Sequence, residues 1–175
     1  NREIFKTISP SMDILISSNL ERLLYHITND ATKIKSYMEK LQSTGCYQVD
    51  EVTLKAIQET FSAGYLDDNA TKKCIHDIYQ QDNYVADTHT AVAWQVAQDY
   101  QKSTQDKTPM VVLSTASPYK FSDSVLSALG EDISDKDEFA LLDKLSTLNK
   151  DKIPQGLAQL QSLPILHNNL CAKED

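Results

Sequence analysis

Pro109-Met-Val-Val-Leu113 is the stretch of sequence that decides the fold class of this chain. Its four consecutive apolar residues, followed by the polar Ser114, are typical of a strand buried on both faces of a parallel sheet. Such a strand needs a partner along each edge, and the sequence offers one other candidate strand, Glu3–Ser9. Because a sheet of two strands is marginal in water, we expect the partner strands to lie in sequence outside these 175 residues.

Helical patterns fill most of the remaining sequence. Ser18 and Glu21 match a capping box, and apolar residues recur after it with a helical period as far as Gly45. A second helix is expected to begin at Asp50 and to end at Gly64. Further helices are expected over residues 69–81, 87–100, 122–129, 135–148 and 154–163. The sequence therefore predicts an α/β fold that is predominantly helical, with few strands.

The composition is that of a globular domain and argues against some partners. Hydrophobic residues make up 41% of the sequence and charged residues 24%, so we expect one domain with a packed core. The formal net charge is −8, which disfavours nucleic acid and anionic membrane surfaces as partners. No apolar run reaches the length of a transmembrane helix, and we expect a cytoplasmic protein. The first residue is Asn1 rather than methionine, so we expect the chain to derive from a longer one.

The three cysteines are Cys46, Cys74 and Cys171. They form no CxxC motif and have no histidine at ligand spacing, so no metal site is expected. An odd and scattered set favours buried thiols in a reducing compartment over a disulfide framework.

Catalytic signatures are sparse in this sequence. The four glycines stand alone and form no phosphate-binding loop, and neither a GxSxG nor an HExxH motif is present. Polar segments stand out at residues 7–13, 87–91 and 113–118. The first and the third follow the predicted strands, and ligands of open α/β sheets bind beyond the carboxyl ends of strands. We therefore expect a ligand site at these segments.

The same segments resemble threonine synthases. Thr7-Ile-Ser-Pro-Ser-Met-Asp-Ile-Leu-Ile-Ser-Ser-Asn-Leu-Glu-Arg22 is similar to the stretch that follows the family's glycine-rich phosphate loop. Asp87-Thr-His-Thr-Ala-Val-Ala93 is similar to its Asp-x-His-Thr-Ala segment, and Val112-Leu-Ser-Thr-Ala-Ser-Pro-Tyr-Lys-Phe121 to its late Ser-Thr-Ala-x-Pro-x-Lys-Phe segment. The three occur in family order. Many members have histidine where Ser117 stands, so no imidazole role is carried to that position.

The resemblance implies an enzyme of the tryptophan-synthase-β-like fold that uses pyridoxal 5'-phosphate (PLP). Such enzymes convert O-phospho-L-homoserine and water to L-threonine and phosphate. Their Schiff-base lysine and glycine-rich loop lie upstream of the three segments, and neither element is found in residues 1–175. The resemblance therefore implies a single C-terminal segment, with a motif-bearing part at 1–121 and a helical extension at 122–175. We assign no catalytic residue to this chain, and by itself it is expected to be inactive and to hold no PLP.

Two hydroxyl side chains are the candidates for binding the cofactor. In this family the pyridine nitrogen usually meets a serine or threonine hydroxyl, which can hydrogen-bond that nitrogen without holding it protonated. Thr115, just past the predicted strand, is the first candidate and Ser114 the second. The alternative is that Thr115 only caps the turn.

The candidates for facing the substrate are Ser9, Ser11, Asp13 and Asn19. They line a loop and a helix start, where free N–H groups suit an anion such as the substrate phosphate. A structural role in the capping box or the turn is the alternative. We interpret His89 and Lys120 as structural residues and Trp94 as part of the core.

Two other classes of protein stay open at this point. A sibling PLP-dependent lyase or dehydratase would share the fold, but is not expected to carry Thr7–Arg22 in this form. A free-standing helical interaction module would bury its own strand at Met110–Leu113. We expect instead that this strand pairs with Ile4–Ile8, pairs with a second copy, or leaves an open edge through which the chain self-associates.

Overall fold

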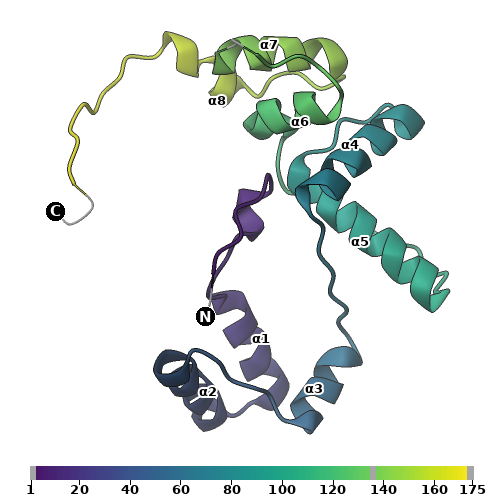
Figure 1. The fold of residues 1–175 in the computed structure, drawn as a ribbon, viewed down its shortest axis with the longest axis vertical. Helices are drawn as coiled ribbons and strands as arrows, with labels where there is room; N and C mark the ends of the chain where they lie inside the picture. Colours follow the sequence, from purple (N-terminus) through teal and green to yellow (C-terminus); the bar gives the residue numbers. More distant parts are fainter. Residues whose placement is uncertain (1–2, 135–136, 173–175) are drawn as a thin grey trace.

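The computed structural model describes residues 3–134 and 137–172, which fold into helices joined by loops (Figure 1). The α-helices are α1 (Ser18–Thr28), α2 (Ala31–Thr44), α3 (Glu51–Gln58), α4 (Asp68–Asp82), α5 (Thr88–Thr104), α6 (Ser122–Ala128), α7 (Glu138–Leu148) and α8 (Gln155–Ala158). Short 3-10 turns are η1 (Pro10–Met12), η2 (Pro118–Phe121) and η3 (Leu160–Ser162). The prediction of a predominantly helical chain is confirmed. No helix in the described ranges is long and apolar enough to cross a membrane.

Neither predicted strand forms within the described residues. Residues 110–113 belong to a loop after α5, where Val111 is 80% and Leu113 71% exposed. Residues 4–8 also lie outside any helix or strand, so the first of the three alternatives, pairing of these two segments, is wrong for this chain. A strand exists through hydrogen bonds to its neighbours, and residues 3–134 and 137–172 supply no second strand to provide them.

Aspartate N-caps fix where most of the helices begin. The carboxylates of Asp50, Asp67 and Asp87 accept hydrogen bonds from backbone N–H groups in the first turns of α3, α4 and α5. Asp30 and Asp137 do the same for α2 and α7. Each carboxylate pairs donors that have no partner within the helix itself. The predicted starts at Asp50 and Asp87 are confirmed, whereas the predicted start at residue 135 lies outside the described residues.

The first predicted helix is in fact two helices. Asn29, in the left-handed conformation with a φ of 49°, ends α1, and Asp30 starts α2. The predicted capping box is wrong as well, because Ser18 is the first residue of α1 and the N-cap residue Ser17 makes no capping hydrogen bond with its side chain. Gly45, with a φ of 81°, ends α2 as predicted. The next helix, α3, already ends at Gln58 rather than near Gly64.

Helices α1, α2 and α3 pack together around a small core of Leu24, Ile34 and Tyr37. Asp50 ties this unit together: its Oδ2 lies 2.6 Å from Lys33 Nζ and accepts a hydrogen bond from the Tyr37 hydroxyl at 3.1 Å. The hydrogen bond from Lys33 holds the pKa of the Asp50 carboxyl well below its usual range. A polar link therefore joins α2 to the start of α3.

Helices α4 to α8 enclose the main core of the chain. Ile75, Val125, Leu126 and Leu145 are fully buried there, and burial of such side chains is the main force that holds the helices together. Trp94 packs against this core from α5, as predicted. The core includes residues on both sides of position 121, so the motif-bearing part and the helical extension share it.

The cysteines do not behave as one class. Cys74 is buried in the main core, whereas Cys46 and Cys171 are exposed, and all three are free thiols. The expectation of buried thiols is therefore met only at Cys74. Cys46 and Cys171 lie in loops outside both cores, where no packed surface surrounds them.

Two stretches of chain connect the two helical units (Figure 1). Residues 13–17 run from the η1 turn to α1, and residues 59–67 run from α3 to α4. The Ile8 N–H donates to Asp68 Oδ1 at 3.1 Å, so the chain before α1 and the chain after α3 meet at one place. The α1–α3 unit is thus an excursion of the chain that leaves and returns at the same point.

Candidate functional site

The three polar segments singled out in the sequence meet at one hydrogen-bonded cluster beside the N-terminus of α5. The Ser11 N–H donates to His89 Nε2 at 3.1 Å and so joins the η1 turn to α5. Thr90 Oγ1 lies 3.3 Å from Ser114 Oγ, which joins α5 to the loop before η2. The His89 ring also packs on Phe121, with 4.7 Å between the ring centroids. We call this set, together with Asp87, the Asp87 cluster.

Asp87 is the fully buried centre of the cluster. Its Oδ1 accepts hydrogen bonds from the backbone N–H groups of His89 and Thr90 at 2.9 and 3.4 Å, and lies 3.1 Å from His89 Nδ1. Its Oδ2 accepts a hydrogen bond from the Thr90 hydroxyl. A buried carboxylate is costly unless it is paired in this way, and the positive end of the α5 dipole also favours it. Both oxygens of the buried Asp87 carboxylate are therefore paired.

The hydrogen bonds assign one tautomer to His89. A backbone N–H can only donate, so Nε2, which faces the Ser11 N–H, carries no proton. Nδ1 then carries the ring proton and donates to Asp87 Oδ1. Both ring nitrogens are thus occupied by protein partners, and the residue is only 5% exposed. This agrees with a structural interpretation of His89.

Ser114 and Thr115, the candidate cofactor residues, line a cavity of about 330 Å³. Ser114 Oγ lies 3.0 Å from the Tyr84 hydroxyl and is also within reach of Thr90, whereas Thr115 is exposed to the cavity and solvent. Four residues of the segment 149–154, which follows α7, line the same cavity: Asn149, Asp151, Lys152 and Pro154. A space of this size is at the lower end of what small-molecule sites occupy.

Tyr119 connects the loop that carries Thr115 to residues 149–154. Its hydroxyl donates to the backbone carbonyl of Asp151 at 2.6 Å, and its side chain is buried against the main core. Burial raises the pKa of Tyr119, so that the hydroxyl keeps its proton and its donor role at neutral pH. This bond fixes the separation of the two sides of the cavity.

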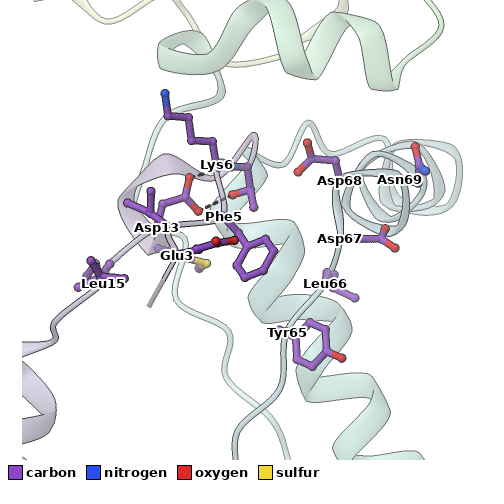
Figure 2. Close-up of a pocket in the computed structure, with 14 residues that line it drawn as sticks. Glu3, Phe5, Lys6, Asp13, Leu15, Tyr65, Leu66, Asp67, Asp68 and Asn69 are labelled. Carbon is purple, nitrogen blue, oxygen red and sulfur yellow. Dashed lines mark hydrogen bonds between the residues drawn. The ribbon is translucent and has the colours of Figure 1, made fainter. Parts of the chain in front are cut away.

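A larger cavity of about 700 Å³ lies beside the η1 turn (Figure 2). Residues 3–7 and 12–15 form one side and residues 65–69 the other, as Figure 2 shows. The side chains on view include the rings of Phe5 and Tyr65, which are 81% and 89% exposed. The cavity is mainly apolar, and its acidic residues are largely engaged in capping and turn contacts.

The candidate substrate residues of the η1 turn have different surroundings. Thr7 braces the turn, since its N–H and its hydroxyl donate to the two carboxylate oxygens of Asp13, each at 2.8 Å. Ser9 is buried, with its hydroxyl 3.1 Å from Thr7 Oγ1. Ser11 is exposed and presents its hydroxyl at the surface, but its N–H is already donated to His89. Of these candidates, Ser11 has the side chain most accessible to a ligand.

Asn19 lies apart from the other candidates, in the first turn of α1. Its Oδ1 accepts hydrogen bonds from the Ser17 hydroxyl and from the Leu20 N–H at 3.0 Å. Within residues 3–134 and 137–172, no hydrogen bond links Asn19 to Ser9, Ser11 or Asp13.

Thr90 lies within the polar segment 87–91 that the sequence singled out, but the sequence did not name it as a site residue. Tyr84 and residues 149–154 were not singled out as part of the site. No local signal existed for Tyr84 or for residues 149–154. They reach the cavity only through the packing of α4, α6 and α7.

Comparison with known proteins shows which class of protein this chain is similar to. A family model described as "Threonine synthase, C-terminal" matches residues 90–167. Threonine synthase-like 1 of Macaca fascicularis is 37% identical over 173 residues, and the threonine synthase of Saccharomyces cerevisiae is 31% identical over 180 residues. The two alignments cover 97% and 92% of this chain but 21% and 32% of the relatives, so the chain spans between a fifth and a third of their length.

Solved structures agree with these sequence matches. The PLP-bound threonine synthase from Brucella melitensis has a TM-score of 0.73 at 34% identity, over 92% of this chain and 30% of that chain. The yeast threonine synthase has a TM-score of 0.73 at 28% identity, over 94% and 33%. The helical fold is thus that of a part of a threonine synthase structure. The chain therefore resembles the C-terminal part of threonine synthases over about nine-tenths of its length.

Proposed function

We propose that this chain forms one wall of the active site of a threonine synthase, which converts O-phospho-L-homoserine and water to L-threonine and phosphate with PLP. The observation that carries the proposal is the convergence of residues 7–13, 87–91 and 114–121 on the Asp87 cluster. These are the segments that resemble the family, and they come from parts of the chain far apart in sequence. Chance similarity would not place all three around one buried carboxylate.

The hydroxyl groups beside the 330 Å³ cavity fit the ring-nitrogen end of PLP. When bound, the cofactor supplies an electron sink. We assign the pyridine nitrogen to the Thr115 hydroxyl, since the Ser114 hydroxyl already has Tyr84 and Thr90 within hydrogen-bond distance. Ser114 then orients the loop that presents Thr115. A neutral hydroxyl hydrogen-bonds the nitrogen without fixing a proton on it.

On the substrate side, we assign contact with the substrate to Ser11 first. Its hydroxyl is exposed at the η1 turn, next to the Asp87 cluster. Ser9 and Asp13 act indirectly: their side chains hydrogen-bond to Thr7 and so set the shape of the turn that presents Ser11. Asn19 reaches the substrate only if the start of α1 also faces the site. The Asp87 cluster excludes water from the contact between the turn and α5, since its central residues are buried.

We further propose that the chain is a single C-terminal segment, with its recognition residues in 1–121 and a helical extension over 122–175. The extension contributes Tyr119's partner Asp151 and other lining residues of the cavity. We also propose a cytoplasmic location. Cys46 and Cys171 are exposed free thiols, which suit a reducing compartment.

The test is an assay of the whole protein that contains this chain, supplied with PLP and O-phospho-L-homoserine, for release of phosphate and formation of L-threonine. Thr115→Val should lower turnover roughly 10- to 100-fold, as expected for one hydrogen bond to the reacting cofactor, with little change in melting temperature. Thr60→Val is the matched control, because Thr60 is exposed in the linker after α3. Absence of threonine formation by the wild type would refute the proposal, and a drop in melting temperature with unchanged turnover would leave Thr115 only its turn-capping role.

A further inference from the structure

We infer that His89 is a positioning residue, which holds the substrate-facing η1 turn in register with the loop that carries Thr115. The effect of His89 on catalysis rests on the proposed function. The contacts of His89 with Ser11 and Phe121 do not depend on that function. His89 would act through Ser11 and Phe121 and would touch neither substrate nor cofactor.

All three family segments are in contact at His89. The η1 turn reaches it through the Ser11 N–H, at 3.1 Å from Nε2. The 114–121 loop reaches it through Phe121, whose ring centroid is 4.7 Å away with a 54° angle between the ring planes. Its own helix, α5, is anchored beneath it by Asp87. A movement of the imidazole would therefore displace both loops.

Asp87 sets the direction in which His89 acts. The carboxylate accepts the proton on Nδ1, and this leaves Nε2 as an acceptor aimed at the backbone of the η1 turn. The opposite tautomer would place an N–H against the Ser11 N–H and would break the contact. Thr88 Oγ1 lies 3.3 Å from the same Nδ1, and Asp87 and Thr88 are both fully buried. The arrangement thus favours one tautomer strongly, because each alternative leaves a buried polar group unpaired.

The η1 turn needs such a support. It is a 3-10 turn of three residues whose N-cap, Ser9, makes no side-chain capping bond. Its other fixed points are the Thr7–Asp13 pair within the turn and the Ile8 N–H bond to Asp68. Among the hydrogen bonds of the described residues, the one to His89 connects the turn directly to the cluster that also contains Ser114. Loss of that bond should leave the turn formed but free to shift relative to Thr115.

Two amide substitutions test separately the two hydrogen bonds of His89, the one to Asp87 and the one from Ser11. In His89→Gln, the side-chain oxygen reaches the position of Nε2 and can accept from the Ser11 N–H. In His89→Asn, the shorter amide can donate to Asp87 from the position of Nδ1, but it does not reach Ser11. His89→Leu removes both bonds. His76→Asn, at an exposed position on α4, is the control for a histidine without such contacts.

The first arm of the experiment uses the chain itself and NMR. Long-range ¹H–¹⁵N spectra of labelled histidine should show His89 as the neutral Nδ1–H form. Hydrogen exchange of the Ser11 amide should be slow in the wild type, in His89→Gln and in His76→Asn. It should be about tenfold faster in His89→Asn and His89→Leu, the effect expected for loss of one hydrogen bond. A proton on Nε2, or a Ser11 amide that exchanges at the same rate in His89→Asn as in the wild type, overturns the inference.

The second arm uses the whole protein and its steady-state kinetics. His89→Asn should raise KM for O-phospho-L-homoserine roughly tenfold relative to His89→Gln, although both variants replace the same ring and should melt at similar temperatures. A purely structural role predicts instead that KM and kcat change only in step with melting temperature, and equal kinetics of the two amide variants would overturn the positioning role. If the wild type makes no threonine, the proposed function fails, and the NMR arm still decides whether His89 holds the turn.

Discussion

Cys74 shows at the scale of a single residue how burial sets chemical reactivity. Its Sγ donates to the Ala91 carbonyl at 3.3 Å inside the main core, and burial raises the pKa of the thiol to about 11. At pH 8 almost none of it is therefore the reactive thiolate. We expect Cys74 to react with a maleimide at least roughly 100-fold more slowly than the exposed Cys46 and Cys171.

Mass spectrometry of the labelled peptides measures these three rates in one sample. In guanidinium chloride all three cysteines should react alike, which controls for intrinsic differences between the peptides. Modification of Cys74 in the native chain at the rate of Cys46 would show that the core opens far more readily than its packing implies.

Single residues also show what a sequence pattern can and cannot predict. Asp87 was expected to cap α5 because an aspartate before a helical stripe is a local signal, and it does so. Its second partner, the ring of His89, is also local, since His89 lies two positions after Asp87 in the sequence. The bond from Ser11 to His89 spans 78 positions and has no local signal. The cap at Asp87 could thus be predicted from the sequence, while the connection of the three segments through His89 could not.

At the scale of elements, the Asp50 cap makes the α1–α3 unit sensitive to acid. The hydrogen bond from Lys33 lowers the pKa of Asp50 in the folded state, so the charged carboxylate favours folding. This contribution is fully present above the unfolded pKa of about 4 and is lost as pH falls below it. We expect Asp50→Asn to lower the melting temperature by a few degrees at pH 7, and expect the difference to shrink toward pH 2.

Asp30→Asn is the matched control for this series, because Asp30 caps α2 in the same unit and asparagine is also a good N-cap. Circular dichroism melts across the pH range give the comparison. A difference between Asp50→Asn and the wild type that stays constant down to pH 2 would contradict the role of the ion pair.

Elements differ in how far their own sequence determines them. Helix starts at Asp50 and Asp87 were predictable, because the cap and the helix lie side by side in sequence. The break between α1 and α2 was not predictable, since the two non-helical residues Asn29 and Asp30 hardly disturb the helical spacing of the apolar residues. The strand predicted at Met110–Leu113 failed because strand structure depends on neighbours that the described residues do not contain.

At the scale of the whole molecule, we predict that the 175 residues alone do not hold PLP covalently. The resemblance places the cofactor's lysine upstream of the three segments, and we interpret Lys120 as a structural residue. After incubation with PLP, borohydride reduction and dialysis, we expect no stoichiometric adduct by mass spectrometry. A single lysine modified in full by this treatment would contradict the assignment.

The exposed apolar loop after α5 should promote association of the isolated chain. Val111, at 80% exposure, lies beside Met110 and Leu113, which are also exposed. Unpaired backbone and apolar side chains together offer a template for pairing with a second copy. We expect the apparent mass in sedimentation experiments to rise with concentration, and Val111→Lys to reduce that rise severalfold.

Val52→Lys is the matched control for this prediction, because Val52 is equally exposed, at 80%, but lies on α3 away from the loop. An equal effect of both variants would point to general hydrophobicity as the cause. A chain that stays monomeric over the whole series would support the alternative of a complete, free-standing module.

The excursion formed by α1–α3 has a topological consequence. Because the chain leaves near Leu15 and returns near Tyr65 beside the same cavity, the unit between them is an insertion in a continuous α4–α8 scaffold that also holds the η1 turn. Replacing residues 16–63 by a short glycine–serine linker should therefore leave the Ser11–His89 contact in place. The α4–α8 scaffold and the α1–α3 unit could then change independently. Relatives could therefore vary the α1–α3 unit in length, or lose it, without a change in the Asp87 cluster.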